Sequence, residues 1–185
     1  MGKAISQRRF YTLQCPVFLV GFMGAGKTTT ARRLARECGI ASLDMDTYIE
    51  RNQGQPIREI FSREGEEGFR NLETQVLKDF ASGNPLLISC GGGVVKRAEN
   101  RRILQDSFVV YLKVSVEEAA SRISDISTRP LFQDERHAEE VIRERLPLYE
   151  EVATCSIDTA QKSPHAVVHE LKHCLIEKGV LCPRP

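Results

Sequence analysis

The sequence predicts an α/β fold, a three-layer α/β/α arrangement in which helices cover both faces of a five-stranded parallel sheet. Short apolar runs alternate along the chain with longer segments of helical periodicity, as expected for repeated β-α-β units. The chain has 185 residues, 41% of them hydrophobic, which is enough for the core of one domain. Strands buried on both faces read as continuous apolar runs, and several of the runs here have that form.

Five apolar runs are the expected strands, and the segments between them are the expected helices. The strands are expected at 15–20, 40–46, 84–89, 107–114 and 153–158. The helices are expected at 28–39, at 46–83 with interruptions near Gly54 and Gly65, and at 95–105, 116–123, 137–151 and 164–178. Gly39 is a typical helix terminator, and Ser163 followed by Pro164 is a typical helix start.

These elements predict one domain over 15–180, preceded by a short N-terminal arm, 1–14. The stretch 124–137 is polar and has no periodicity. A loop of that length inside a compact domain is more often a functional lid than a passive connection, so we interpret it as a lid.

Charge and cysteine usage narrow the class of protein. The formal net charge is +1, which argues against a nucleic-acid or membrane partner, so any affinity for anions must be local. The six cysteines are scattered without a CxxC pair, as is typical of free thiols in a reducing compartment. With no apolar signal core at the start of the sequence, we expect a cytoplasmic protein.

The stretch GFMGAGKT matches the phosphate-binding pattern G-x-x-x-x-G-K-[ST] at Gly21, Gly26, Lys27 and Thr28. Its context also fits, because an apolar strand precedes it and a helix follows it. Backbone N–H groups of such a loop surround a polyphosphate, the lysine reaches the β- and γ-phosphates, and the threonine hydroxyl binds Mg²⁺. We therefore predict binding of ATP with Mg²⁺. The expected nucleotide ligands here are Gly24, Ala25, Gly26, Lys27, Thr28 and Thr29.

Two aspartates, Asp44 and Asp46, follow the second expected strand. Residues two apart on a strand share a face, so both carboxylates would point into the crevice at the carboxyl ends of the strands. Asp44 would face a magnesium ion held by Thr28, and Asp46 would accept or orient a hydroxyl proton of the phosphate acceptor. The alternative for Asp46 is that it only caps the following helix.

Four further features suggest the acceptor side of the site. Arg70 and Glu73 lie three apart on one helical face, either as a carboxylate-binding guanidinium with its brace or as an ordinary surface ion pair. The glycines at 91–93 allow close approach of a ligand, or form only a flexible turn. Arg129 in the lid could close over transferring phosphates. Arg145 lies just before Pro147, which should kink or start a helix.

The ordered set of motifs resembles the shikimate kinase family from Val17 to about Val168. The matching stretches are GFMGAGKTT, LDMD, IREIF, GEEGFRNLE, CGGGVV, TRPLF and RLPLYEEVA. The resemblance implies a nucleoside-monophosphate-kinase-like fold with sheet order 2-3-1-4-5. It also implies transfer of the ATP γ-phosphoryl group to the 3-hydroxyl of shikimate, by an enzyme that we expect to be a monomer.

The resemblance also implies a role for each matching residue. Asp46, Lys27 and Arg129 would be catalytic, and Thr28 and Asp44 would hold magnesium. ATP would be bound by the phosphate-binding loop together with Arg122, Arg129 and Pro164. Of these, Arg122 and Pro164 would lie beside adenine. The substrate-binding region would span about 45–75 and the lid 124–137. The shikimate ligands would be Asp46, Arg70, Gly92 and Arg145, and Glu73 would hold Arg70 in place. Gly91 and Gly93 would complete a glycine strip, residues 91–93.

Two other functions remain open from the residues. The first is another small-metabolite kinase such as a gluconate kinase, since a carboxylate clamp fits either acid. The second is a nucleotide-binding module without turnover, which would predict a broken acceptor site. The histidines at 165, 169 and 173 share a helical face, and we interpret them as a solvated stripe.

Overall fold

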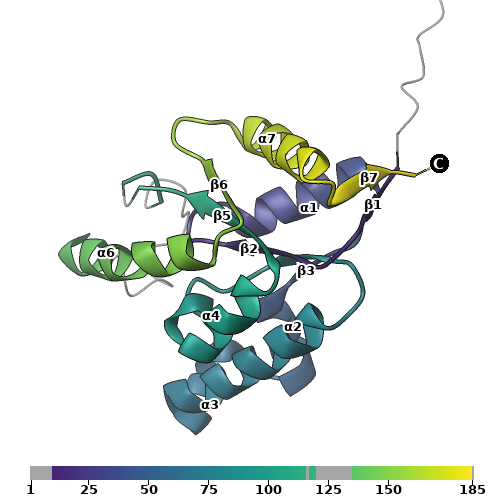
Figure 1. The fold of residues 1–185 in the computed structure, drawn as a ribbon. Coiled ribbons are helices and arrows are strands. Elements are labelled where there is room, and N and C mark those ends of the chain that lie inside the picture. The colour runs from purple at the N-terminus through teal and green to yellow at the C-terminus, as the bar shows by residue number, and fades with distance from the viewer. Residues whose placement is uncertain (1–9, 116, 120–134, 185) are drawn as a thin grey trace, which may run out of the picture.

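The computed structural model describes residues 10–115, 117–119 and 135–184. Its centre is a five-stranded parallel sheet in the order β3-β4-β2-β5-β6, with helices on both faces (Figure 1). Counted along the chain within this sheet, the order is 2-3-1-4-5, so the predicted topology is confirmed. The strands are β2 (Val17–Val20), β3 (Ser42–Asp44), β4 (Leu87–Ser89), β5 (Phe108–Lys113) and β6 (Cys155–Asp158).

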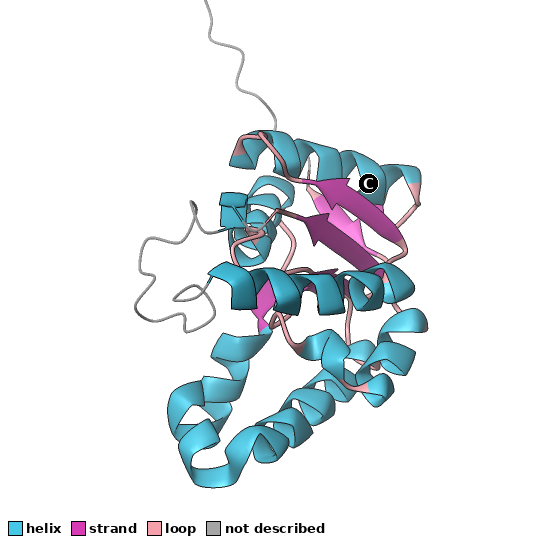
Figure 2. Cartoon of the chain, turned by 90° about the vertical axis from the view of Figure 1, so that its left-hand side faces the viewer, coloured by secondary structure: helices cyan, strands magenta, loops and turns pink. Residues whose placement is uncertain are grey.

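The helices form a layer on each face of this sheet, as Figure 2 shows from the side. Helices α1 (Lys27–Cys38) and α7 (Pro164–Glu177) pack together on one face. The other face carries α2 (Met45–Gln53), α3 (Ile57–Ala81), the short 3₁₀ helix η1 (Val94–Lys96), α4 (Ala98–Gln105) and α6 (Glu135–Val152).

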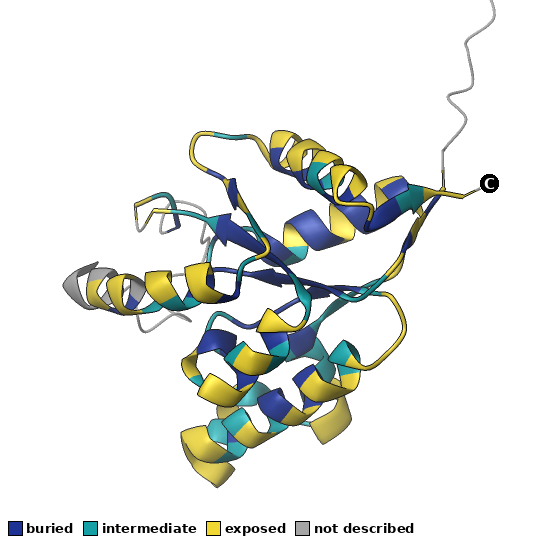
Figure 3. Cartoon of the chain, in the orientation of Figure 1, coloured by how far each residue is buried: buried dark blue, intermediate teal, exposed yellow. Residues whose placement is uncertain are grey.

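Two hydrophobic clusters hold these layers to the sheet, and β2 contributes to both. Val17 and Leu19 face the cluster beneath α1 and α7, whereas Phe18 and Val20 face the cluster of the other layer. The strand is buried along its whole length (Figure 3), because its side chains alternate between two covered faces. This double burial explains why the run carries no polar residue.

Glycines end or bend the helices where the sequence predicted interruptions. Gly39 and Gly54 cap α1 and α2 in the left-handed conformation, with φ of 67° and 65°. Gly65 does not end a helix but kinks α3, at φ 71° and ψ −178°. A side chain would be strained at that φ, so glycine lets the chain bend and continue.

A second, two-stranded sheet joins the two ends of the described chain. Strand β1 (Tyr11–Leu13) pairs antiparallel with β7 (Leu181–Pro183), and Tyr11 and Leu13 are buried against the cluster of α1 and α7. We did not predict these strands, because three-residue runs carry too little periodicity to be recognised. Strand β1 lies within the stretch expected to be an arm, and β7 lies beyond residue 180.

None of the helices within the described ranges is both long enough and apolar enough to span a bilayer.

Candidate active site

The carboxyl ends of β2, β3 and β4 open into one cavity of about 560 Å³. The phosphate-binding loop after β2 lines it, as do Asp44 at the end of β3, Asp46 just beyond it, Gly91 and Gly92 after β4, and Pro164 at the start of α7. Convergence of several strand ends on one crevice is the usual location of a ligand in an open α/β sheet. The arrangement therefore brings the phosphate-binding loop and both aspartates into one space, whereas Arg70, Glu73 and Arg145 are not among the described residues that line it.

The phosphate-binding loop has the backbone shape that the glycines predicted. Gly24 and Gly26 adopt left-handed φ values of 78° and 86°, and a Cβ at Gly24 would lie 2.7 Å from the carbonyl oxygen of Ala119. The Lys27 ammonium donates to the carbonyl oxygens of Gly21 and Phe22, at 2.8 and 2.9 Å. These hydrogen bonds hold Lys27 over the loop in which the phosphates would bind.

Thr28 and Asp44 are in direct contact. The Thr28 hydroxyl donates to Asp44 Oδ2 at 2.6 Å and lies 3.1 Å from the hydroxyl of Ser89 at the end of β4. Burial disfavours the charge on Asp44, but hydrogen bonds from Thr28, Thr47 and Ser89 outweigh it and hold the pKa of the carboxyl below its usual range. A carboxylate and two hydroxyls in contact form an all-oxygen donor set that suits magnesium.

The two aspartates do not lie on one strand, and here the strand argument was wrong. Strand β3 ends at Asp44, which caps α2 by accepting the Thr47 N–H at 3.1 Å, while Asp46 lies in the first turn of the helix. The alternative that made Asp46 the cap is also wrong. The cap bond starts the helix directly after Asp44. Both carboxylates line the cavity because of this helical turn and not because of strand alternation, and the Met45 side chain between them is buried.

The glycines that follow β4 allow Asp46 and Arg70 to lie close to the backbone. A Cβ on Gly91 would lie 2.6 Å from Asp46 Oδ1, and a Cβ on Gly93 would lie 2.6 Å from a terminal nitrogen of Arg70. Real Cβ contacts are essentially never that short, so a side chain at either position would force Asp46 or Arg70 to move from where it lies here.

Arg70 and Glu73 form a half-buried ion pair rather than a surface one. Arg70 Nη1 donates to Glu73 Oε2 at 2.8 Å, and Glu73 is fully buried. Burial raises the pKa of Glu73, although the Arg70 charge acts in the opposite direction. Glu73 Oε1 has no hydrogen-bond partner among the described residues. The pair is a preorganised guanidinium of the kind that binds carboxylates.

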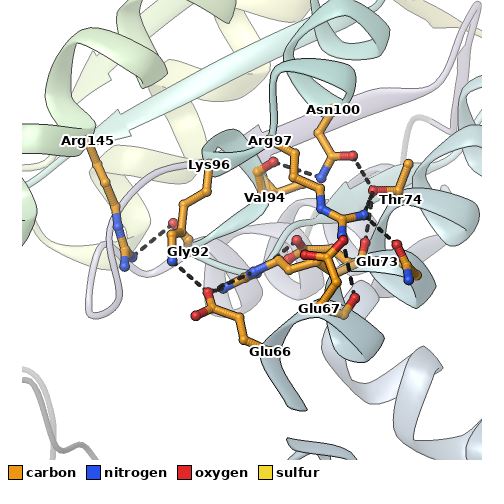
Figure 4. A network of polar contacts seen from close by, with 12 residues as sticks. Glu66, Glu67, Glu73, Thr74, Gly92, Val94, Lys96, Arg97, Asn100 and Arg145 are labelled. Carbon is orange, nitrogen blue, oxygen red and sulfur yellow. Dashed lines mark hydrogen bonds and ion pairs between the residues drawn. The ribbon is translucent and has the colours of Figure 1, made fainter. Parts of the chain in front are cut away.

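A wider set of charges surrounds this pair (Figure 4). Glu66 accepts from Lys96 at 2.6 Å and from Arg70 at 3.3 Å, and the hydrogen bond from Lys96 lowers the pKa of Glu66. Arg97 pairs with Glu67 from the same side. Arg70 is thereby fixed from both ends, by Glu73 in the interior and by Glu66 at the surface.

Arg145 approaches the same strip from α6. Its Nη1 lies 3.4 Å from the carbonyl oxygen of Gly92, a contact seen in Figure 4. Tyr149, one turn later on the helix, donates to that same oxygen, and its ring stacks on Tyr111 with centroids 5.1 Å apart. Pro147 lies within α6 and neither starts nor ends it.

The comparisons with known proteins agree with this geometry. A family model described as shikimate kinase matches residues 23–176. The chain belongs to the shikimate kinase family. A shikimate kinase of Thioalkalivibrio sulfidiphilus is 42% identical over 159 residues, 84% of each chain, and one of Vibrio parahaemolyticus is 40% identical over 88% of this chain and 96% of its own.

Solved structures extend the likeness to three dimensions. The shikimate kinase of Acinetobacter baumannii in complex with shikimate is 39% identical, with a TM-score of 0.82 over 89% of this chain and 95% of its own. A gluconokinase of Sinorhizobium meliloti is 18% identical, with a TM-score of 0.50 over 90% of this chain and 98% of its own. At that identity the second structure shows a shared fold and nothing more.

Some site residues of this shikimate kinase family member were not recognised from the sequence. Ser89 contacts the Thr28 hydroxyl, and Thr159 and Lys162 line the cavity. Tyr149 donates a hydrogen bond to the Gly92 carbonyl oxygen. Tyr149 could have been found, because it lies four residues after Arg145 and so shares its helical face. The others stand in short strand ends and loops, where the sequence gives no periodic signal.

Of the remaining predicted residues, Pro164 lines the cavity and others lie outside the described part of the chain. Pro164 is the first residue of α7 and lines the cavity, with Ser163 as its cap. Arg122, Arg129 and the lid up to residue 134 lie outside the described residues.

Cys90 and the histidines of α7 are the two further features. Burial raises the pKa of the Cys90 thiol, which lies beside the glycine strip and lines the cavity, so we expect this thiol to be a poor nucleophile. Within the part of the chain that the structure describes, no cluster of His, Cys, Asp and Glu could hold a metal, the histidine stripe of α7 included.

Proposed function

We propose that the chain transfers the γ-phosphoryl group of ATP to the 3-hydroxyl of shikimate, giving shikimate 3-phosphate and ADP. The observation that supports this best is the placement of Asp46, Arg70 and Arg145 around one glycine strip, beside an intact phosphate-binding loop. Membership of the shikimate kinase family supports the same acceptor. The working enzyme would be a monomer that needs neither nucleic acid nor membrane.

Asp46 would be the residue that orients the acceptor hydroxyl. Phosphoryl transfer needs an in-line nucleophile more than a strong base, so a carboxylate that accepts the hydroxyl proton or aims its lone pair is sufficient. Asp46 lies against Gly91, in the cavity lined also by the phosphate-binding loop. The hydroxyl it holds would therefore face the γ-phosphate.

Lys27, Thr28 and Asp44 would serve the nucleotide. The Lys27 ammonium would contact the β- and γ-phosphates, and Thr28 with Asp44 would hold Mg²⁺ directly or through water. When bound, the ion would neutralise phosphate charge. Arg129 would add positive charge from the lid, and Arg122 and Pro164 would flank adenine.

Arg70 and Arg145 would bind the acceptor carboxylate beside the glycine strip, each from its own helix. The guanidinium of Arg70 is braced by Glu73, so little conformational entropy is lost when an anion binds. Arg145 on α6, whose Nη1 lies 3.4 Å from the Gly92 carbonyl oxygen, would supply a second cation for the same carboxylate.

The deciding experiment is a coupled assay of ADP release with shikimate, with gluconate and with no acceptor. We expect magnesium-dependent ADP release with shikimate alone. A rate with gluconate equal to that with shikimate would transfer the assignment to a broader metabolite kinase. Nucleotide binding without acceptor-dependent ADP release from folded protein would support a binding module instead.

A further inference from the structure

Two cysteines from different elements meet beside the sheet. Cys155 is the first residue of β6, and Cys174 lies near the C-terminal end of α7. Their Sγ atoms are 2.9 Å apart, and both side chains are partly exposed. Of the six cysteines, this is the pair whose sulfur atoms are recorded in contact among the described residues.

Both thiols are held by well-packed neighbours, so their approach depends on regular secondary structure. Cys155 is paired with Val110 in the parallel sheet and packs against the hydrophobic cluster of α1 and α7. Cys174 lies between Leu171 and Leu175, whose side chains are fully buried in the same cluster. The S–S bond of a disulfide is about 2.0 Å long, so sulfur atoms that lie 2.9 Å apart need only a small further approach to form one.

We propose that Cys155 and Cys174 are a site of reversible oxidation, at which a small disulfide such as oxidised glutathione converts the two thiols into an internal disulfide. One cysteine thiolate attacks the small disulfide, forming a mixed disulfide and releasing one reduced glutathione. The second cysteine thiolate then attacks the protein sulfur of that mixed disulfide and releases the other. Two electrons pass from the cysteines to the glutathione disulfide, and the two thiol protons end on the released glutathione.

The contact between the two sulfur atoms favours internal closure. Burial and the neighbouring Cys174 thiol raise the pKa of Cys155 to about 12, although Lys178 acts in the opposite direction. Once either thiol carries glutathione, the other lies directly beside it and can displace the glutathione.

The disulfide would close a loop that includes part of the candidate active site. Cys155 and Cys174 are 19 residues apart, and the segment between them contains Thr159, Lys162 and Pro164 of the cavity lining. A cross-link over such a loop restricts the unfolded chain more than the folded one, so the oxidised protein should be more stable.

The test uses the full-length protein, incubated with excess oxidised glutathione and then digested without reduction. We expect a peptide pair joined through Cys155 and Cys174 by mass spectrometry, and its loss after dithiothreitol. The melting temperature of the oxidised form should rise by roughly 5 °C or more. If both thiols stay reduced, or if glutathione remains attached to either one without internal closure, the proposal is wrong.

Variants give a second measurement with a matched control. In Cys155→Ser and in Cys174→Ser the remaining thiol has lost its partner, so each variant should form a glutathione adduct but no internal cross-link. Cys182→Ser removes a partly exposed cysteine that contacts the Gly179 carbonyl oxygen, and it should keep both the cross-link and the stability gain. An internal cross-link that persists in either single variant would overturn the pairing, and an unchanged melting temperature on oxidation would overturn the stabilisation.

Discussion

At the scale of single residues, Asp44 and Asp46 have different surroundings although they are two apart. Asp44 is fixed by hydrogen bonds from Thr28 and from the start of α2. Asp46 lies in the first turn of that helix, against the backbone of Gly91. The sequence indicated two roles for the pair, but the local hydrogen bond that ends the strand at Asp44 could not be read from residue types alone.

Asp46→Asn tests the role in orienting the acceptor. The change keeps the shape of the side chain but removes its charge and its capacity to accept a proton, so we expect kcat to fall about 100-fold. The ATP dissociation constant should stay within about twofold of the parent value. Steady-state assays and nucleotide titration measure the two quantities, with the exposed Asp79→Asn as the control. Near-normal turnover would remove Asp46 from the reaction.

Asp44 should give a defined pH dependence of stability. Its pKa in the folded protein lies below the ordinary value of 3.8, so its stabilising contribution is complete above that value and is lost as the pH falls through the folded pKa. Asp44→Asn keeps a capping acceptor but loses the carboxylate.

We therefore expect the Asp44→Asn variant to be less stable than the parent at about pH 7, and the gap to narrow toward about pH 3. Urea unfolding across that range measures the gap. A gap of constant size would mean that the charge of Asp44 does not contribute, and that only its shape does.

At the scale of elements, α6 delivers two side chains to one carbonyl oxygen. Arg145 and Tyr149 both reach Gly92, so the helix fixes the glycine strip as well as supplying a charge. The helix was predicted closely, at 137–151 against Glu135–Val152, because its periodicity is long and strong. The contacts of this helix depend on how α6 is placed against the loop after β4. Hydrophobic periodicity within the helix does not reveal that placement.

Tyr149→Phe should weaken acceptor binding more than nucleotide binding. The variant leaves the ring stack intact but removes the hydroxyl that fixes Gly92, so we expect the shikimate KM to rise several-fold and the ATP KM to change little. Stability should fall by about 1 kcal/mol, because the half-buried Gly92 carbonyl oxygen loses one of its two hydrogen bonds. Tyr111→Phe, on the other ring of the stack, is the matched control. Equal rises in both KM values would indicate a general loss of structure.

At the scale of the whole molecule, the five-stranded sheet was predictable and the two-stranded one was not. The parallel strands are largely apolar and alternate with helices, whereas β1 and β7 are three residues long and meet across nearly the whole sequence. Pairings between distant segments leave no local signal. The order of the parallel strands came from family resemblance, since periodicity alone does not fix it.

Leu13→Ala should destabilise the protein without changing its chemistry. Leu13 is buried in the cluster of α1 and α7, so the cavity left behind should cost about 2–4 kcal/mol. Thr12→Ala, on the exposed side of β1, should cost little. Chemical denaturation gives both values, and kcat measured well below the melting temperature should be unchanged. A marked fall in kcat would show that the two-stranded sheet influences the active site.

The division of the core by β2 has a consequence for how such an enzyme can change. Helices α1 and α7 rest on one cluster, while α2, α3 and α6, which carry Asp46, Arg70 and Arg145, rest on the other. We therefore expect a core substitution beneath these three residues to repack its own cluster first. Its effect should reach the phosphate-binding loop through β2, which both clusters share, or through the Thr28–Asp44 hydrogen bond.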